Sequence, residues 1–289
     1  MTSSWMIVAG FLFATMGVFV KLGAEHFGAA ELAFYRSFVM LLIATGIIYT
    51  TRGTVATKYL AQHLVRGIAG AISLGGYFYA IAKLPLATAQ TLNYTSPIFL
   101  AIVTVAVLGE RFSAWLIVAV VIGFVGVAML LQPTFAEGNP GPAMIGLFSG
   151  VLASWAYLSV RNLGRLGEPD ARVLFWFGVT ATIGCGLWQL ITSNFHAIGW
   201  DNAWILLGMG VTATAAQLAM TRAYRTGNTL VVSALSYSTL VFASFATLVV
   251  WQQALAPLEW GGMAVIIASG ILATRVETKE QVEEAGFEG

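Results

Sequence analysis

The chain has 289 residues, of which 58% are hydrophobic and only 9% are charged, and its formal net charge is +1. Soluble globular domains carry about 25% charged residues, so this composition excludes a mostly water-exposed surface and favours contact with lipid. The near-zero net charge gives no basis for nucleic-acid binding. The single cysteine, Cys185, lies in an apolar run and excludes an internal disulfide.

Apolar runs of about 20 residues, the length of a helix that crosses a bilayer, recur along the whole chain. The ten expected spans are 4–22, 30–50, 64–82, 87–108, 113–131, 142–162, 171–192, 201–222, 228–251 and 257–275. The first run follows Met-Thr-Ser-Ser without a basic residue, so we expect a retained span and no cleaved signal peptide. The sequence therefore predicts an all-α integral membrane protein with ten transmembrane helices.

The distribution of Lys and Arg predicts the orientation, because these residues are enriched in cytoplasmic segments. With the N-terminus in the cytoplasm, only Lys21 and Lys83 lie on the outer side, and Arg36 lies within a span. Every other Lys and Arg then falls on the cytoplasmic side, so we expect both termini in the cytoplasm. The tail from residue 276 onward is acidic and polar, and we expect it to be disordered.

A weak internal repeat relates the stretch 80–132 to a segment about 143 residues further along the chain. In this alignment Gln90, Asn93, Tyr94 and Phe99 correspond to Ser233, Ser236, Tyr237 and Phe242, respectively. Such a repeat within an apolar chain is typical of transporters built from two related halves.

The repeat predicts the domain organisation. We expect a first five-helix repeat over 1–134, a Pro/Gly linker on the outer side over 135–141, a second repeat over 142–275 and an acidic cytoplasmic tail over 276–289. Because five is an odd number of crossings, the second repeat enters the membrane in the opposite sense. The two repeats are therefore expected to be inverted and to enclose one midplane site that opens alternately to each side.

Several local motifs stand at the ends of the predicted spans. They are Ala33-Phe34-Tyr35-Arg36, the stretch YAIAKLPLA at 79–87, Tyr94-Thr95-Ser96-Pro97, Leu108-Gly109-Glu110-Arg111 and the Gly-rich fifth span. Together they resemble the ten-helix EamA-type members of the drug/metabolite transporter superfamily over residues 4–275. The second half departs from the pattern, with Gln252-Gln253 in place of Gly-Glu and Leu240 where a Pro is expected.

The resemblance implies export of small metabolites or amino acids across a bacterial inner membrane. Within that family, the sequence resembles exporters of aromatic amino acids, since the expected cavity is rich in Tyr and Trp. Drug-like or other small organic solutes are the alternative. Oligomeric state is not predicted, and the expected partners are a small-molecule substrate and the lipid bilayer.

The candidate substrate-binding residues begin with two polar stripes. Gln90, Asn93 and Pro97 share one face of the fourth span, and Ser233 and Ser236 occupy the equivalent face of the ninth. Facing stripes at equal depth would line a shared cavity, whereas the alternative is that they only join helices. Pro97 removes one helix hydrogen bond, so it is a candidate hinge or a static kink.

Aromatic and basic side chains complete the candidate site. Tyr79, Tyr94, Trp155 and Tyr237 could contact a substrate with a ring face and one hydrogen bond, or could belong to the interfacial belt. Lys83 could attract a substrate carboxylate or extend to the outer surface. Arg36 could do the same or bind backbone carbonyls near a helix end.

Other chemistries lack the residues they need. No Asp, Glu or His is expected at mid-span, and no P-loop pattern is present, so we expect downhill transport or exchange without proton coupling or ATP drive. We expect no catalytic residue, no metal site and no cofactor, which argues against a membrane enzyme. A channel would need rings of polar groups from several helices and is the weaker alternative.

Overall fold

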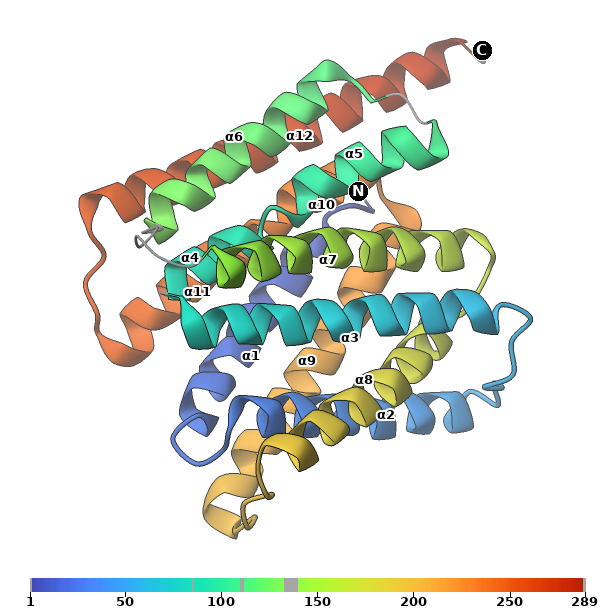
Figure 1. Cartoon of the computed structure of the whole chain (residues 1–289). Helices are drawn as coiled ribbons and strands as arrows, with labels where there is room; N and C mark the ends of the chain where they lie inside the picture. Colours follow the sequence, from blue (N-terminus) through green and yellow to red (C-terminus); the bar gives the residue numbers. More distant parts are fainter. Residues whose placement is uncertain (1, 85, 110–111, 133–139, 288–289) are drawn as a thin grey trace.

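The computed structural model describes residues 2–84, 86–109, 112–132 and 140–287, and all regular elements in these ranges are α-helices (Figure 1). The helices are α1 (Trp5–Gly23), α2 (Ala29–Thr50), α3 (Leu60–Lys83), α4 (Leu86–Asn93), α5 (Ser96–Leu108), α6 (Ala114–Leu131), α7 (Gly141–Arg165), α8 (Asp170–Thr192), α9 (Trp200–Thr226), α10 (Thr229–Ser236), α11 (Ser238–Trp251) and α12 (Pro257–Phe287).

The predicted membrane fold is confirmed. Within the described ranges, nine helical stretches are long and apolar enough to cross a membrane. Helix α3 occupies the position of the remaining predicted span. The chain is therefore an all-helical, multi-pass membrane protein.

Two predicted spans are not continuous, which corrects the expectation of single helices over 87–108 and 228–251. The fourth span divides into α4 and α5 at Tyr94–Thr95, and the ninth divides into α10 and α11 at Tyr237. Side chains compete with the helical ladder at both breaks: Thr95 Oγ1 donates to the Leu92 carbonyl at 2.5 Å, and Ser236 Oγ donates to the Ser233 carbonyl at 2.7 Å.

Pro97 lies in the first turn of α5, where its missing N–H costs nothing. It therefore marks the start of a new helix and not a kink inside one. The ninth span breaks at the equivalent place although it has Leu240 in place of the proline.

Helices from the first half of the chain pack against helices from the second half. Helix α1 contacts α9, α3 contacts α7, α2 contacts α8, and α6 lies along α12 (Figure 1). The α6–α12 contact is close, as the glycines at it show. An added Cβ on Gly126 would lie 2.9 Å from the Gly262 carbonyl oxygen. An added Cβ on Gly262 would lie 2.6 Å from the Leu130 nitrogen. Small residues at these positions therefore allow the two helices to approach closely.

The N-terminal residues contact α12 and the end of α9. Ser3 Oγ donates to Glu277 Oε1 at 2.6 Å, and Thr2 Oγ1 donates to the Thr226 carbonyl at 2.9 Å. The expectation of a disordered tail from residue 276 is wrong up to Phe287, because α12 continues to that residue. The segment is rich in Glu, Lys and Gln, which favour helix once a preceding helix has paid the nucleation cost.

Some predicted features fall on residues outside the described ranges. These are most of the linker 135–141, together with Pro85 and the Glu110-Arg111 pair of the motifs. The described part resumes at Pro140, and α7 begins at Gly141.

Candidate functional site

A cavity of about 190 Å³ lies among helices from both halves of the chain. Its polar lining includes Arg36 from α2, Arg66, Ser73 and Tyr77 from α3, Asn93 from α4, Tyr157 from α7 and Gln217 from α9. Phe13, Phe177 and Met220 are prominent in its apolar wall. The cavity therefore combines ring faces with hydrogen-bonding groups and two cations, and none of its described lining residues is an acid.

Arg66 is the more deeply buried cation, with an exposed fraction of 3%. Its guanidinium carbon lies 3.6 Å from the centroid of the Phe177 ring, which fixes the plane of the group by a cation–π contact. Among the described residues, its Nε and Nη1 have no hydrogen-bond partner, and neither has Nε of Arg36. Gly70, one turn further along α3, leaves room for the Arg66 side chain, since an added Cβ on Gly70 would lie 2.8 Å from Arg66 Nη1.

Asn93 is the predicted site residue that lines this cavity. It ends α4, and its Nδ2 donates to Ser149 Oγ of α7 at 3.1 Å, so it also joins the two halves. Gln90, one turn earlier, is half-buried and hydrogen-bonds to Tyr77, which lines the cavity. Gln90 therefore stands behind the cavity wall and supports it.

Ser233 and Ser236 satisfy backbone groups and do not line the cavity. Ser233 is buried, and its Oγ donates to the Thr229 carbonyl at 2.8 Å, whereas Ser236 Oγ bonds the Ser233 carbonyl. The ring centroids of Tyr94 and Tyr237 lie 6.3 Å apart at the two helix breaks. These two rings pack with α6 and α12 and likewise stand outside the cavity lining.

Three other predicted site residues point away from the interior. Tyr79, near the end of α3, is 42% exposed, and Trp155, in the middle of α7, is 40% exposed. Lys83 is exposed at the end of α3. The structure does not bring these three to the cavity with Asn93.

Arg66 is a cavity residue that the sequence pattern places with the cytoplasmic cations, because it lies near the start of a span. For Arg36 the pattern leaves a carboxylate-binding and a backbone-binding role open. A signal for both existed, because each is a long cation inside a helix with no acid one turn away on the same helix face.

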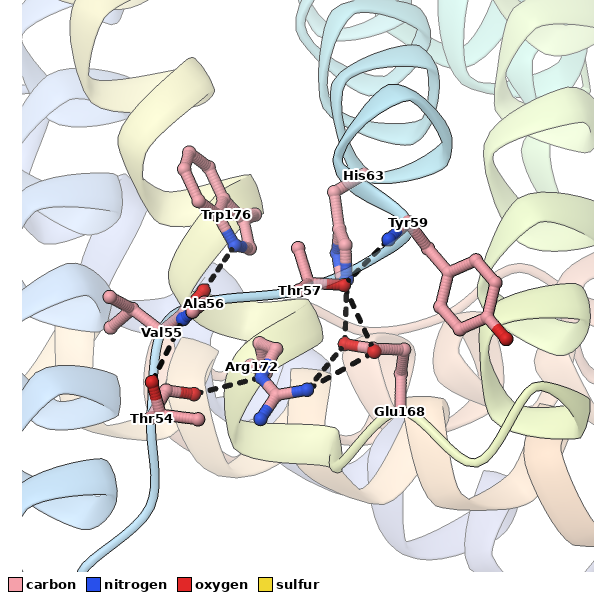
Figure 2. A network of polar contacts seen from close by, with 9 residues as sticks. All are labelled: Thr54, Val55, Ala56, Thr57, Tyr59, His63, Glu168, Arg172 and Trp176. Carbon is pink, nitrogen blue, oxygen red and sulfur yellow. Dashed lines mark hydrogen bonds and ion pairs between the residues drawn. The ribbon is translucent and has the colours of Figure 1, made fainter.

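A polar network that includes His63, one turn before Arg66 on α3, joins the two halves (Figure 2). We name it the Glu168 cluster, and it consists of Thr57, His63, Glu168 and Arg172. His63 Nε2 lies 2.9 Å from Glu168 Oε2. Arg172 Nη1 donates to both carboxylate oxygens at 3.1 Å, and Thr57 Oγ1 donates at 3.0 Å.

The Glu168 cluster also holds the α2–α3 loop against α8. Arg172 Nε donates to the Thr54 carbonyl at 2.8 Å, and Trp176 Nε1 donates to the Val55 carbonyl at 3.1 Å (Figure 2). Burial of Glu168 disfavours its charged form, but the hydrogen bonds of its three partners outweigh this effect. They hold the pKa of the carboxyl below its usual value.

A second carboxylate–histidine contact lies at the other end of α8. Glu31, buried in the first turn of α2, accepts a hydrogen bond from the His196 backbone N–H at 2.8 Å and lies 2.7 Å from His196 Nδ1. The two contacts are alike. Glu31, at the start of α2, binds a histidine of the second half, and Glu168, just before α8, binds a histidine of the first half. Among the described residues, no three His, Cys, Asp or Glu side chains gather as metal ligands would.

Comparisons with known proteins agree with a transport role. Residues 1–132 match a family model described as the EamA-like transporter family. The chain is 28% identical over 275 residues to the pseudopaline exporter CntI of Pseudomonas aeruginosa, covering 94% of this chain and 95% of the relative. It is 24% identical over 284 residues to a riboflavin transporter of Rhizobium johnstonii, covering 97% and 93%.

A solved crystal structure shares the fold. It superposes with a TM-score of 0.84 at 17% sequence identity, covering 96% of this chain and 98% of that chain. The relatives are named as transporters and not as enzymes, in agreement with the expectation from the sequence.

Proposed function

We propose that this chain, whose residues 1–132 match the model of the EamA-like transporter family, is a transporter of that kind and exports small organic metabolites from the cytoplasm, with amino acids, including aromatic ones, as the first class to test. The observation that carries the proposal is the cavity shared by both halves, which offers cations, amides and ring faces to one small solute. An exporter of drug-like or other small organic solutes is the alternative within the same mechanism.

The lining suits a solute with an apolar body and a charged end. Phe13, Phe177 and Met220 provide an apolar surface, and Arg36 and Arg66 provide a positive one. Ring faces with a few placed polar groups are the usual composition of small-molecule sites.

Alternating access is the mechanism that the helix packing supports. Helix α1 contacts α9 as α7 contacts α3, and α1 contacts α11 as α7 contacts α5. A two-fold relation between inverted repeats would match α1 with α7, α3 with α9 and α5 with α11. Each contact in the first pairing would then have the observed counterpart in the second. The paired helix breaks at Tyr94–Thr95 and Tyr237 fit the same relation.

The two carboxylate–histidine contacts, which lie at opposite ends of α8, then act as closures. Opening toward one end would separate the Glu168 cluster, and opening toward the other would separate Glu31 from His196. Pro97, at the start of α5, is the proposed hinge for movement of the broken span. We place the protein in a bacterial inner membrane, with both termini in the cytoplasm and transport running downhill or by exchange.

The test is counterflow in proteoliposomes loaded with unlabelled phenylalanine and supplied with labelled phenylalanine. We expect saturable uptake that depends on the internal pool, and loss of most of it in Asn93→Ala. Gln253→Ala, in an exposed loop, is the matched control and should transport normally. Repeating the assay with a labelled drug-like cation examines the alternative. Flux of either probe without saturation or counterflow would indicate a channel and contradict the proposal.

A further inference from the structure

We propose that the cavity selects solutes of net negative charge, because Arg36 and Arg66 form a carboxylate-binding site and no acid is present among the described residues that line it. This inference rests on the proposed transport function and narrows its substrate class. It concerns the charge of the solute and not the shape of its apolar part.

The first step is the geometry of Arg66. Its guanidinium carbon lies over the Phe177 ring, and two of its nitrogens, Nε and Nη1, have no hydrogen-bond partner among the described residues. The N–H groups of these two nitrogens lie on different edges of the guanidinium, so each can donate a separate charge-assisted hydrogen bond to an anionic oxygen. Gly70 preserves the room around Nη1.

The second step is that Arg36 adds a further positive charge to the same cavity. It reaches the cavity from α2, and its buried Nε also lacks a partner. Two cations that line one cavity repel each other, and burial of each charge carries a desolvation cost. A bound anion offsets both penalties, so the cavity favours negative charge.

The third step is that nearby acids do not neutralise these cations. Glu168 is the acid near the start of α3, and it is occupied by His63, Arg172 and Thr57. The lining residues that the structure describes include no Asp or Glu.

An amino-acid zwitterion is therefore only half matched. Its carboxylate meets a guanidinium, but its ammonium group finds ring faces and neutral side chains and no carboxylate. A solute in which the ammonium is masked, or replaced by a second carboxylate, avoids this mismatch. We expect organic anions to bind better than zwitterions and cations to be rejected.

The experiment uses four probes that share a phenyl group and differ in charge: phenylalaninamide, phenylalanine, N-acetylphenylalanine and benzylsuccinate. Their binding to the purified chain is measured by the rise in thermal unfolding temperature, and their transport by uptake into proteoliposomes. We expect the order benzylsuccinate, N-acetylphenylalanine, phenylalanine, with no response to phenylalaninamide. Replacing Arg66 or Arg36 by Gln should weaken anion binding by about tenfold to a hundredfold.

Three variants separate recognition from folding. Arg66→Gln removes a buried, uncompensated charge, so it should be at least as stable as the wild type without ligand. Arg66→Lys keeps the charge without the planar fork and should recover part of the binding. Arg275→Gln alters an exposed arginine of α12 and should retain the wild-type order.

Each result has a distinct meaning. Two results would overturn the charge-selection proposal and leave the transport proposal standing. One is saturable uptake whose order does not follow the charge of the probes. The other is an order of probes that is unchanged when both Arg36 and Arg66 are replaced. Absence of uptake for every probe contradicts the transport proposal itself. Stabilisation by chloride alone, without any response to the organic anions, contradicts the carboxylate site.

Discussion

The imidazole Nε2 of His63 lies 2.9 Å from Glu168 and joins the start of α3 to the loop between α7 and α8. The first residue belongs to the first half of the chain and the second residue to the second half. His63 is one turn before Arg66 on α3, so movement at this contact would be transmitted directly to the cavity wall. The Glu31–His196 contact has the equivalent form at the opposite end of α8.

Replacing Glu168 by Gln should destabilise the closed structure. The amide loses the charge that His63 and Arg172 bind, and hydrogen bonds to charged groups contribute about 1.5–3 kcal/mol. We expect a lower thermal unfolding temperature and faster exchange of α3 backbone amides near His63, measured by hydrogen–deuterium exchange. Glu25→Gln, at an exposed loop position, is the control and should leave both measurements unchanged. An unaltered unfolding temperature in Glu168→Gln would show that the cluster does not hold the halves together.

Stability should also depend on pH through Glu168. Because the pKa of its carboxyl is lowered below the ordinary value of 4.5 in the folded protein, its contribution is fully present above that value. The contribution is lost as the pH falls through the lowered folded-state pKa. Unfolding temperatures of the wild type and Glu168→Gln, measured from about pH 7 down to about pH 3, should therefore converge at the acidic end. A constant difference at all pH values would contradict the charged role of Glu168.

Gly70→Ala should impair solute binding more than stability. Its Cβ would lie 2.8 Å from Arg66 Nη1 and 3.1 Å from the Phe177 ring, so the guanidinium must move. We expect weaker binding of benzylsuccinate by about tenfold. Gly75→Ala lies on the same helix with nothing within 4 Å of its added Cβ, and it should bind the probe as the wild type does. Equal binding by both variants would separate Arg66 from recognition.

Gly262→Ala should destabilise the contact between α6 and α12. The added methyl would lie 2.6 Å from the Leu130 nitrogen, and because backbone cannot yield as a side chain can, overpacking of about 1–3 kcal/mol is expected. The neighbouring Gly261→Ala meets only the end of the Met129 side chain, at 3.4 Å, and should be neutral or slightly stabilising. The comparison is made by thermal unfolding in detergent, and equal unfolding temperatures would argue against close packing at Gly262.

Sequence reasoning recovered the membrane fold because lipid leaves few alternatives. An apolar run of sufficient length must be helical in a bilayer, so runs such as 113–131 could be identified without tertiary information. The Gly-rich fifth span is also recognisable in the sequence, since small residues in apolar helices commonly mark close helix contacts. Asn93 is a candidate from the sequence because its spacing from Gln90 and Pro97 places the three residues on one helix face.

Only the tertiary structure decided which polar groups share the cavity. Helical spacing gives the face of a residue, but in a membrane protein both the lipid-facing and the inward-facing sides are apolar, so Tyr79 and Trp155 could not be assigned to either. The divided spans depended on local competition by Thr95 and Ser236 for backbone carbonyls. Arg66 joined Arg36 only because α2 and α3 bring side chains from different parts of the sequence into one space. The composition thus determined a bundle of membrane helices, whereas the packing of those helices determined where its charge is enclosed.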